Sequence, residues 1–206
     1  MKFRELLETV GDLPLFRSSL LLAGDRDPAD LRRQLARWNA AGRIIQLRRN
    51  VYVLAHPWRR VQPHPFLVAN ELHRPSYVSL QSALAYYGLI PEAVPVTTSI
   101  TTARPDDFDT AVGRYTYRHV RPEVFFGYES SRMAPDQEAL VADPAKALLD
   151  LVYLTPGGDS VQYLASLRLE DLETVSAEAL EEHAQRWGKG KVTRATQTIV
   201  RMMDRA

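Results

Sequence analysis

Apolar side chains recur at helical spacing within residues 26–41, on a stretch that is otherwise polar and rich in arginine. The positions at i, i+4 and i+7 are Leu31, Leu35 and Trp38, which lie on one side of a helix. Asp27 suits the N-cap position, and Pro28 suits the first turn, where its missing N–H is tolerated. Gly42 favours the left-handed conformation that ends many helices. The pattern therefore predicts an amphipathic helix over residues 26–41.

The opposite face of this predicted helix is cationic and low in bulk. Its outward residues are Arg32, Arg33, Gln34, Ala36, Arg37 and Ala40. The two alanines would let the helix approach a polyanion closely. Arginine-rich outer faces are also common on ordinary solvated helices, so the helix alone leaves both interpretations open.

Two short β-type runs, residues 44–47 and 51–54, follow directly and predict a hairpin. Arg48, Arg49 and Asn50 form its tip, and asparagine tolerates the positive φ that a tight turn requires. A helix and an arginine-tipped hairpin that follow one another can hold a groove and its flanking phosphates together. The pair of elements therefore favours nucleic-acid binding more than the helix does alone.

Helical patterns over residues 3–10 and 18–24 precede the arginine-rich helix. Three helices followed by a hairpin is the order of a winged helix-turn-helix, in which the third helix reads the major groove. In that arrangement Arg33 and Arg37 would reach base edges. The other four arginines would neutralise phosphates, namely Arg26, Arg32, Arg48 and Arg49. The predicted DNA-binding residues are Arg26, Arg32, Arg33, Gln34, Arg37, Arg48, Arg49 and Asn50.

Prolines alternate with polar and basic residues over residues 57–65, which predicts a linker. We therefore expect an α+β protein, with a winged helix-turn-helix at residues 1–56 and a C-terminal domain at residues 66–206. The second domain should be mixed α/β, with a small sheet and a helical C-terminus. Its predicted strands are residues 94–102, 114–120 and 124–128. Its predicted helices are residues 66–72, 79–88, 159–166, 170–174, 176–187 and 191–205, with another that begins at Asp143.

The net charge of +1 hides an asymmetry along the chain. Residues 1–62 contain 12 Lys and Arg against 6 Asp and Glu, a net charge of +6. Residues 63–206 contain 14 against 19, a net charge of −5. A basic first part suits a polyanionic partner, whereas the acidic remainder would repel one.

The composition excludes several classes of function. The chain has 206 residues and no cysteine, so it has neither disulfides nor a thiol nucleophile. Its first residues lack the apolar core of a secretory signal, and no run approaches the roughly 18 apolar residues of a membrane span. We therefore expect a cytoplasmic protein that does not enter the membrane.

No catalytic residue, cofactor or metal site is expected. The five histidines form no paired metal-binding motif, and neither a phosphate-binding glycine loop nor a nucleophile elbow is present. The acidic cluster Asp106, Asp107 and Asp109 is interpreted as a solvated loop. Asp150 lies on an apolar helix one turn after Lys146, and we interpret these two as a structural ion pair.

Three motifs point to a known family. The run L-x-R-x-x-x-x-G-R-I-x-x-L-x-x-x-V-Y covers residues 35–52, Ser-x-x-Ser-Ala-Leu-x-x-x-Gly-Leu covers residues 79–89, and Pro-x-x-x-Leu-Leu-Asp covers residues 144–150. In this order they resemble AbiE-type antitoxins, the regulator–antitoxin members of type IV toxin–antitoxin systems. Asn50 stands where that family usually has glycine, and asparagine also accepts the left-handed conformation.

The resemblance implies a transcriptional autorepressor that binds operator inverted repeats. It also implies an antitoxin that counters a nucleotidyltransferase toxin in abortive infection, a form of phage defence. The protein would be a monomer in solution or a DNA-dependent dimer, and a direct complex with the toxin is left open. Two alternatives remain, a winged-helix module for protein–protein interaction and a plain transcriptional regulator without a toxin partner.

Overall fold

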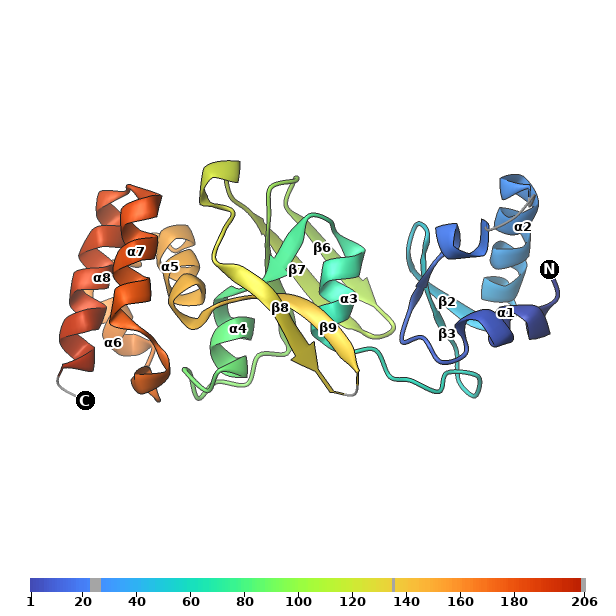
Figure 1. Cartoon of the computed structure of the whole chain (residues 1–206), viewed down its shortest axis with the longest axis horizontal. Coiled ribbons are helices and arrows are strands. Elements are labelled where there is room, and N and C mark those ends of the chain that lie inside the picture. Colours follow the sequence, from blue (N-terminus) through green and yellow to red (C-terminus); the bar gives the residue numbers. More distant parts are fainter. Residues whose placement is uncertain (23–26, 135, 205–206) are drawn as a thin grey trace.

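The computed structural model describes residues 1–22, 27–134 and 136–204. Within these ranges the chain is a mixed α+β protein with eight α-helices and two β-sheets. Figure 1 shows three parts in a row: a small sheet with its helices, a larger sheet, and a group of helices. The N-terminus lies at one end of this row, and the group of helices forms the other end.

The N-terminal part contains a three-stranded antiparallel sheet with strand order β1-β3-β2. Its elements are α1 (Phe3–Val10), β1 (Phe16–Arg17), a 3₁₀-helix (Ser18–Leu22), α2 (Pro28–Ala40), β2 (Ile44–Arg48) and β3 (Val51–Leu54). The predicted first helix, arginine-rich helix and hairpin are thus confirmed as elements.

Local chemistry fixes both ends of α2. The Asp27 carboxylate accepts a hydrogen bond from the Ala29 amide at 2.8 Å, as an N-cap does, and Pro28 opens the first turn. Gly42 follows the helix with φ of 65°, and Asn50 at the hairpin tip has φ of 68°. The predicted left-handed positions are therefore both confirmed.

Two local predictions for this part are corrected. The predicted helix over residues 18–24 is a 3₁₀-helix over its described part, residues 18–22, while residues 23 and 24 lie outside the described residues. Phe16 and Arg17 form a short strand that the pattern did not predict. Its pairing with Tyr52 and Val51 is tertiary, so two residues of sequence do not reveal it.

The small sheet is buried on both faces. Tyr52 and Leu54 of β3 join a core with α1 and α2, whereas Val51 and Val53 join the core of the larger sheet. Successive side chains of a strand point to opposite faces, so β3 alternates between the two cores. Leu47 of β2 also belongs to the larger core. The small sheet is therefore packed between its own helices and the rest of the chain.

The larger sheet has six strands in the order β6-β7-β5-β4-β9-β8. The strands are β4 (Ser76–Val78), β5 (Val96–Thr101), β6 (Asp106–Thr110), β7 (Gly113–His119), β8 (Tyr128–Met133) and β9 (Gln137–Ala142). Neighbours pair antiparallel except β5 with β7 and β4 with β9, which are parallel. Helix α3 (Pro65–Leu72) packs against β4 and β9, and α4 (Leu80–Tyr86) packs against β5.

Helices complete the chain. They are α5 (Pro144–Leu154), α6 (Val161–Ser166), α7 (Ala177–Trp187) and α8 (Gly190–Met203), with short 3₁₀-helices at Pro122–Val124 and Leu172–Thr174. Helix α5 contacts α4, α7 and α8, and thereby joins the sheet to the helical end. None of the helices described here is both long and apolar enough to cross a membrane.

The strand predictions for this part were correct in two cases and wrong in one. Residues 94–102 contain β5, and residues 114–120 cover all of β7 except its first residue, Gly113. Residues 124–128 instead form the end of a 3₁₀-helix, a short loop and only the first residue of β8, Tyr128. Gly127 adopts φ of 70° there and ends any extended run. The acidic cluster predicted as a loop is strand β6 at the edge of the sheet. Charged residues are common on such edges, where they oppose pairing with other chains.

Two hydrogen bonds join the predicted linker, residues 57–65, to strand β9 of the larger sheet. The Gln137 side chain accepts a hydrogen bond from the His64 amide at 2.8 Å and donates one to the Gln62 carbonyl at 3.0 Å. The division of the chain at this segment stays a prediction.

Candidate nucleic-acid interface

Helix α2 lies toward one end of the molecule (Figure 1). Three arginines on its outer face, Arg32, Arg33 and Arg37, are exposed. Arg33 forms an ion pair with Asp30, and Arg32 Nε donates to the Pro28 carbonyl at 3.3 Å. The Arg37 guanidinium has no hydrogen bond or ion pair within the part of the chain that the structure describes. Helical turns thus place Arg33 and Arg37 on one exposed surface with the small residue Ala36 between them.

Gln34 lies at the edge of this surface, where its amide faces the backbone of Met1. With the amide oriented to satisfy both groups, its nitrogen donates to the Met1 carbonyl at 3.0 Å. The side chain is half-buried, so it is less available to a partner than the arginines are.

The tip of the β2–β3 hairpin keeps two of the predicted residues exposed, Arg49 and Asn50. The Asn50 carbonyl accepts a hydrogen bond from the Ser18 amide at 3.1 Å, which ties the tip to the start of the 3₁₀-helix. Arg49 therefore lies on a turn whose next residue, Asn50, is held in place by this hydrogen bond.

Arg48 contacts the end of α3. Its guanidinium donates to the Leu72 carbonyl, lies 3.1 Å from His73 Nδ1, and stands over the Phe108 ring at 5.0 Å. The last carbonyls of a helix lack intrahelical partners and attract cations. Arg48 is thus half-buried and engaged at the end of α3, and its contact with phosphate stays a prediction. Arg26, also predicted to contact phosphate, lies outside the described residues.

Arg17 makes a similar contact that the sequence did not indicate. Its Nε lies 2.6 Å from a Glu71 carboxylate oxygen, and its Nη2 donates to the Glu71 carbonyl at 2.7 Å. The partners are 54 positions apart, so no local spacing could have revealed the pair. Arg17 and Arg48 together attach the small sheet to the C-terminal end of α3.

A second cluster of ionisable groups lies wholly inside the protein. Lys146 and Asp150 form an ion pair whose side chains are both 0% exposed. Tyr77 and Ser79 donate to the other carboxylate oxygen at 3.1 and 2.7 Å. The predicted pairing of Lys146 with Asp150 is therefore confirmed.

Burial affects both members of this pair. Desolvation raises the pKa of Asp150 above its ordinary value, and it lowers the pKa of Lys146. The Lys146 ammonium also lies 4.1 Å from the centre of the Trp187 ring, where the aromatic face attracts a cation. Because no atom of either charged side chain reaches solvent, we interpret the cluster as structural rather than catalytic.

The described part of the chain, residues 1–22, 27–134 and 136–204, contains no group of three or more histidine, aspartate or glutamate side chains placed to hold a metal ion. The three aspartates Asp106, Asp107 and Asp109 are spread along strand β6.

No protein-family model matches the chain, and no curated protein matches its sequence.

Proposed function

We propose that the N-terminal part is a winged helix that binds double-stranded DNA, with α2 in the major groove and the β2–β3 hairpin as the wing. The observation that carries this proposal is the exposed face of α2, where Arg33 and Arg37 flank the small residue Ala36 at an uncovered end of the molecule. Close approach of the helix and bidentate arginine contacts are what major-groove recognition requires.

The roles of the arginines follow from their surroundings. Arg37, without a partner among the described residues, reads a base edge, and Arg33 does so after it leaves Asp30. Arg32 and Arg49 neutralise phosphates on either side of the groove. Arg48 takes no part, because it is engaged with α3. Asn50 shapes the wing through its left-handed backbone.

The biological role proposed for this DNA binding is autorepression by an antitoxin. The support for it is the resemblance in residues 35–52, 79–89 and 144–150 to AbiE-type antitoxins. In this proposal two copies bind an inverted repeat upstream of the gene, and the C-terminal part counters a nucleotidyltransferase toxin. A nucleotidyltransferase gene beside this one would support that role. Without such a gene, a plain transcriptional regulator is the better description.

The test of DNA binding is a salt series with a duplex from the region upstream of the gene. Arg37→Ala should reduce the preference for this duplex over a random one, by about 1–3 kcal/mol. Arg49→Ala should weaken both duplexes alike and reduce the slope of log K against log salt by about one unit.

Arg118→Ala is the matched control, because Arg118 is an exposed arginine on β7 in the larger sheet. It should leave both affinities unchanged. If Arg37→Ala and Arg49→Ala behave like this control, the proposed interface is wrong. Absent DNA binding together with a stable co-purified protein would favour the protein–protein module instead.

A further inference from the structure

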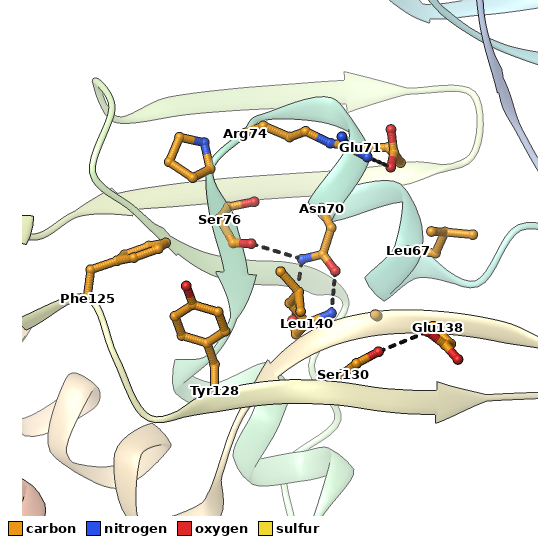
Figure 2. A pocket seen from close by; sticks show the side chains of 12 residues that line it. Leu67, Asn70, Glu71, Arg74, Ser76, Phe125, Tyr128, Ser130, Glu138 and Leu140 are labelled. Atoms are coloured by element: carbon orange, nitrogen blue, oxygen red, sulfur yellow. Dashed lines mark hydrogen bonds and ion pairs between the residues drawn. The ribbon is translucent and has the colours of Figure 1, made fainter. Parts of the chain in front are cut away.

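A cavity of about 400 Å³ lies between α3 and strands β4, β8 and β9. Figure 2 shows side chains from all four elements directed toward it. Its lining includes Asn70, Glu71, Ser76, Phe125, Tyr128 and Glu138. This volume is within the range of about 300–1,000 Å³ that is usual for small-molecule sites.

The cavity exists because β4 and β9 diverge. These parallel neighbours pair only at Val78 and Val141. Beyond that pair the Asn70 side chain bridges them: its nitrogen donates to the Ser76 and Leu140 carbonyls, both at 3.4 Å, and its oxygen accepts from the Leu140 amide at 2.6 Å. These hydrogen bonds therefore hold the opening between β4 and β9 in place.

One wall of the cavity is aromatic and rigid. The Tyr128 ring stacks on the buried Tyr77 ring, with 4.5 Å between the ring centres and an interplanar angle of 13°. The Tyr128 and Phe125 rings meet edge to face, with their centres 5.2 Å apart. Figure 2 shows the Tyr128 hydroxyl directed between Phe125 and Ser76. A wall of this kind suits a planar ring.

One polar group in the cavity lacks a partner. Ser76 is only 4% exposed, yet its hydroxyl has no hydrogen bond to any described residue. Buried hydroxyls are normally satisfied, so a ligand that reached this one would supply its missing hydrogen bond. Together with the Tyr128 hydroxyl it offers donors and acceptors to the edge of a planar ring.

The charges around the cavity disfavour an anion. Two carboxylates line it, Glu71 and Glu138, against the single guanidinium of Arg74. Glu71 is paired with both Arg74 and Arg17 and is therefore compensated, whereas exposed Glu138 accepts only from the Ser130 hydroxyl at 3.1 Å among the described residues. A free carboxylate at the rim is a good acceptor for sugar hydroxyls, and it would repel a phosphate.

We propose that this cavity binds a nucleoside without phosphate, with the base against Tyr128 and Phe125 and the ribose hydroxyls at Glu138. We further assign to Glu71 the role of linking the cavity to the small sheet. This second statement rests on the proposed DNA binding.

The link through Glu71 is a short one. One side of its carboxylate faces Arg74 at the cavity, and the other oxygen and the backbone carbonyl hold Arg17. Arg17 pairs with Val51, which lies next to the tip of the β2–β3 hairpin. A ligand that shifts Glu71 therefore acts on the strand that carries the wing.

Calorimetry with adenosine, guanosine, cytidine and uridine tests the site directly. At least one nucleoside should bind with a dissociation constant below about 1 mM. Its 5′-monophosphate should bind at least about tenfold more weakly because of the uncompensated carboxylate of Glu138. Failure of all four nucleosides, or equal binding of the monophosphate, overturns the proposal.

Ser76→Ala and Ser99→Ala form a matched pair for locating the ligand. Both serines are buried on neighbouring strands, and both hydroxyls lack a partner among the described residues, but Ser99 does not line this cavity. Ser76→Ala should weaken the bound nucleoside about five- to tenfold, whereas Ser99→Ala should not change it. Equal effects of the two substitutions would place the ligand elsewhere and refute the site.

The link is tested by the affinity for the upstream duplex with and without saturating nucleoside. In the native protein the DNA affinities with and without nucleoside should differ by at least about fivefold. In Arg17→Met the two DNA affinities should be nearly equal, while the affinity for the nucleoside itself should be unchanged. A ratio of one in a native protein that binds DNA refutes the link. If DNA does not bind at all, the proposed function fails, while calorimetry still decides the nucleoside site.

Discussion

Lys146 shows at the scale of one residue how a buried charge is made tolerable. Its ammonium meets the Asp150 carboxylate, the Tyr77 hydroxyl at 2.8 Å and the face of Trp187. Isolated burial of such a charge would be very costly, and the partners offset that cost only as a complete set. The i,i+4 spacing indicated Asp150, but Tyr77 is 69 positions away and could not be inferred.

Removal of one member of this pair should be strongly destabilising. We expect Lys146→Met or Asp150→Asn to lower the free energy of unfolding by about 3–5 kcal/mol, because each leaves a buried charge unpaired. The double variant should lose about 1–3 kcal/mol less than the sum of the single losses. Urea denaturation measures all three.

The exposed pair Arg4 and Glu8 has the same i,i+4 spacing and serves as the control. Arg4→Met should change stability within experimental error, because water solvates the remaining carboxylate. Strictly additive losses for Lys146 and Asp150 would contradict the coupling described here.

Gly127 is required where the chain passes Lys146. It adopts φ of 70°, and a Cβ placed on it would lie 3.0 Å from Lys146 Cγ. Gly127→Ala therefore adds a steric contact to the left-handed penalty of about 1–2 kcal/mol.

Gly42→Ala is the matched substitution, because Gly42 has φ of 65° and nothing described within 4 Å of the added Cβ. Thermal denaturation should show a larger loss for Gly127→Ala than for Gly42→Ala. Equal losses would mean that Lys146 moves aside without cost.

At the scale of elements, the end of α3 determines how the N-terminal part is attached. The Glu71 and Leu72 carbonyls lie in the last turn of that helix, where intrahelical donors are lacking. Arg17 and Arg48 supply those donors from the small sheet. The same arginine that the hairpin pattern assigned to DNA thus serves as a helix cap in another part of the chain.

Neighbouring arginines of the hairpin should consequently behave differently. Arg48→Met should increase hydrogen exchange in β2, β3 and the last turn of α3, since it removes a cap and a cation–π contact. Arg49→Met, one position further and exposed, should leave exchange in these elements unchanged. Identical exchange in the two variants would argue against a structural role for Arg48.

At the scale of the whole molecule, the small sheet is shared between two cores. Leu47, Val51 and Val53 pack with the larger sheet, although the sequence places them in the basic N-terminal third. Burial of one such side chain contributes about 1.5–3 kcal/mol. The N-terminal part therefore depends on the rest of the chain for a share of its stability.

A fragment of residues 1–56 should accordingly be less stable than the same residues within the full chain. We expect its hydrogen exchange in α2 to be faster, because three apolar side chains become exposed to water. Equal protection of α2 in the fragment and in the full chain would instead support a self-sufficient domain, as the predicted division at residues 57–65 implies.

Sequence alone determined the features that depend on neighbours a few residues apart. The periodicity and cap of α2, the left-handed positions Gly42 and Asn50, the hairpin and the Lys146–Asp150 spacing are all of this kind. Their physics is local, since hydrogen bonds and side-chain pairs at short separations do not depend on the rest of the fold.

Only the tertiary structure decided the strand order, the opening between β4 and β9, and the direction of Arg48. Strand β4 has three residues and pairs with β9 more than 60 positions later, so neither strand carries a sufficient signal by itself. The sequence around an arginine at a hairpin tip is the same whether its guanidinium faces solvent or the end of a distant helix. Long-range packing makes that choice, and with it decides which arginines remain for a partner.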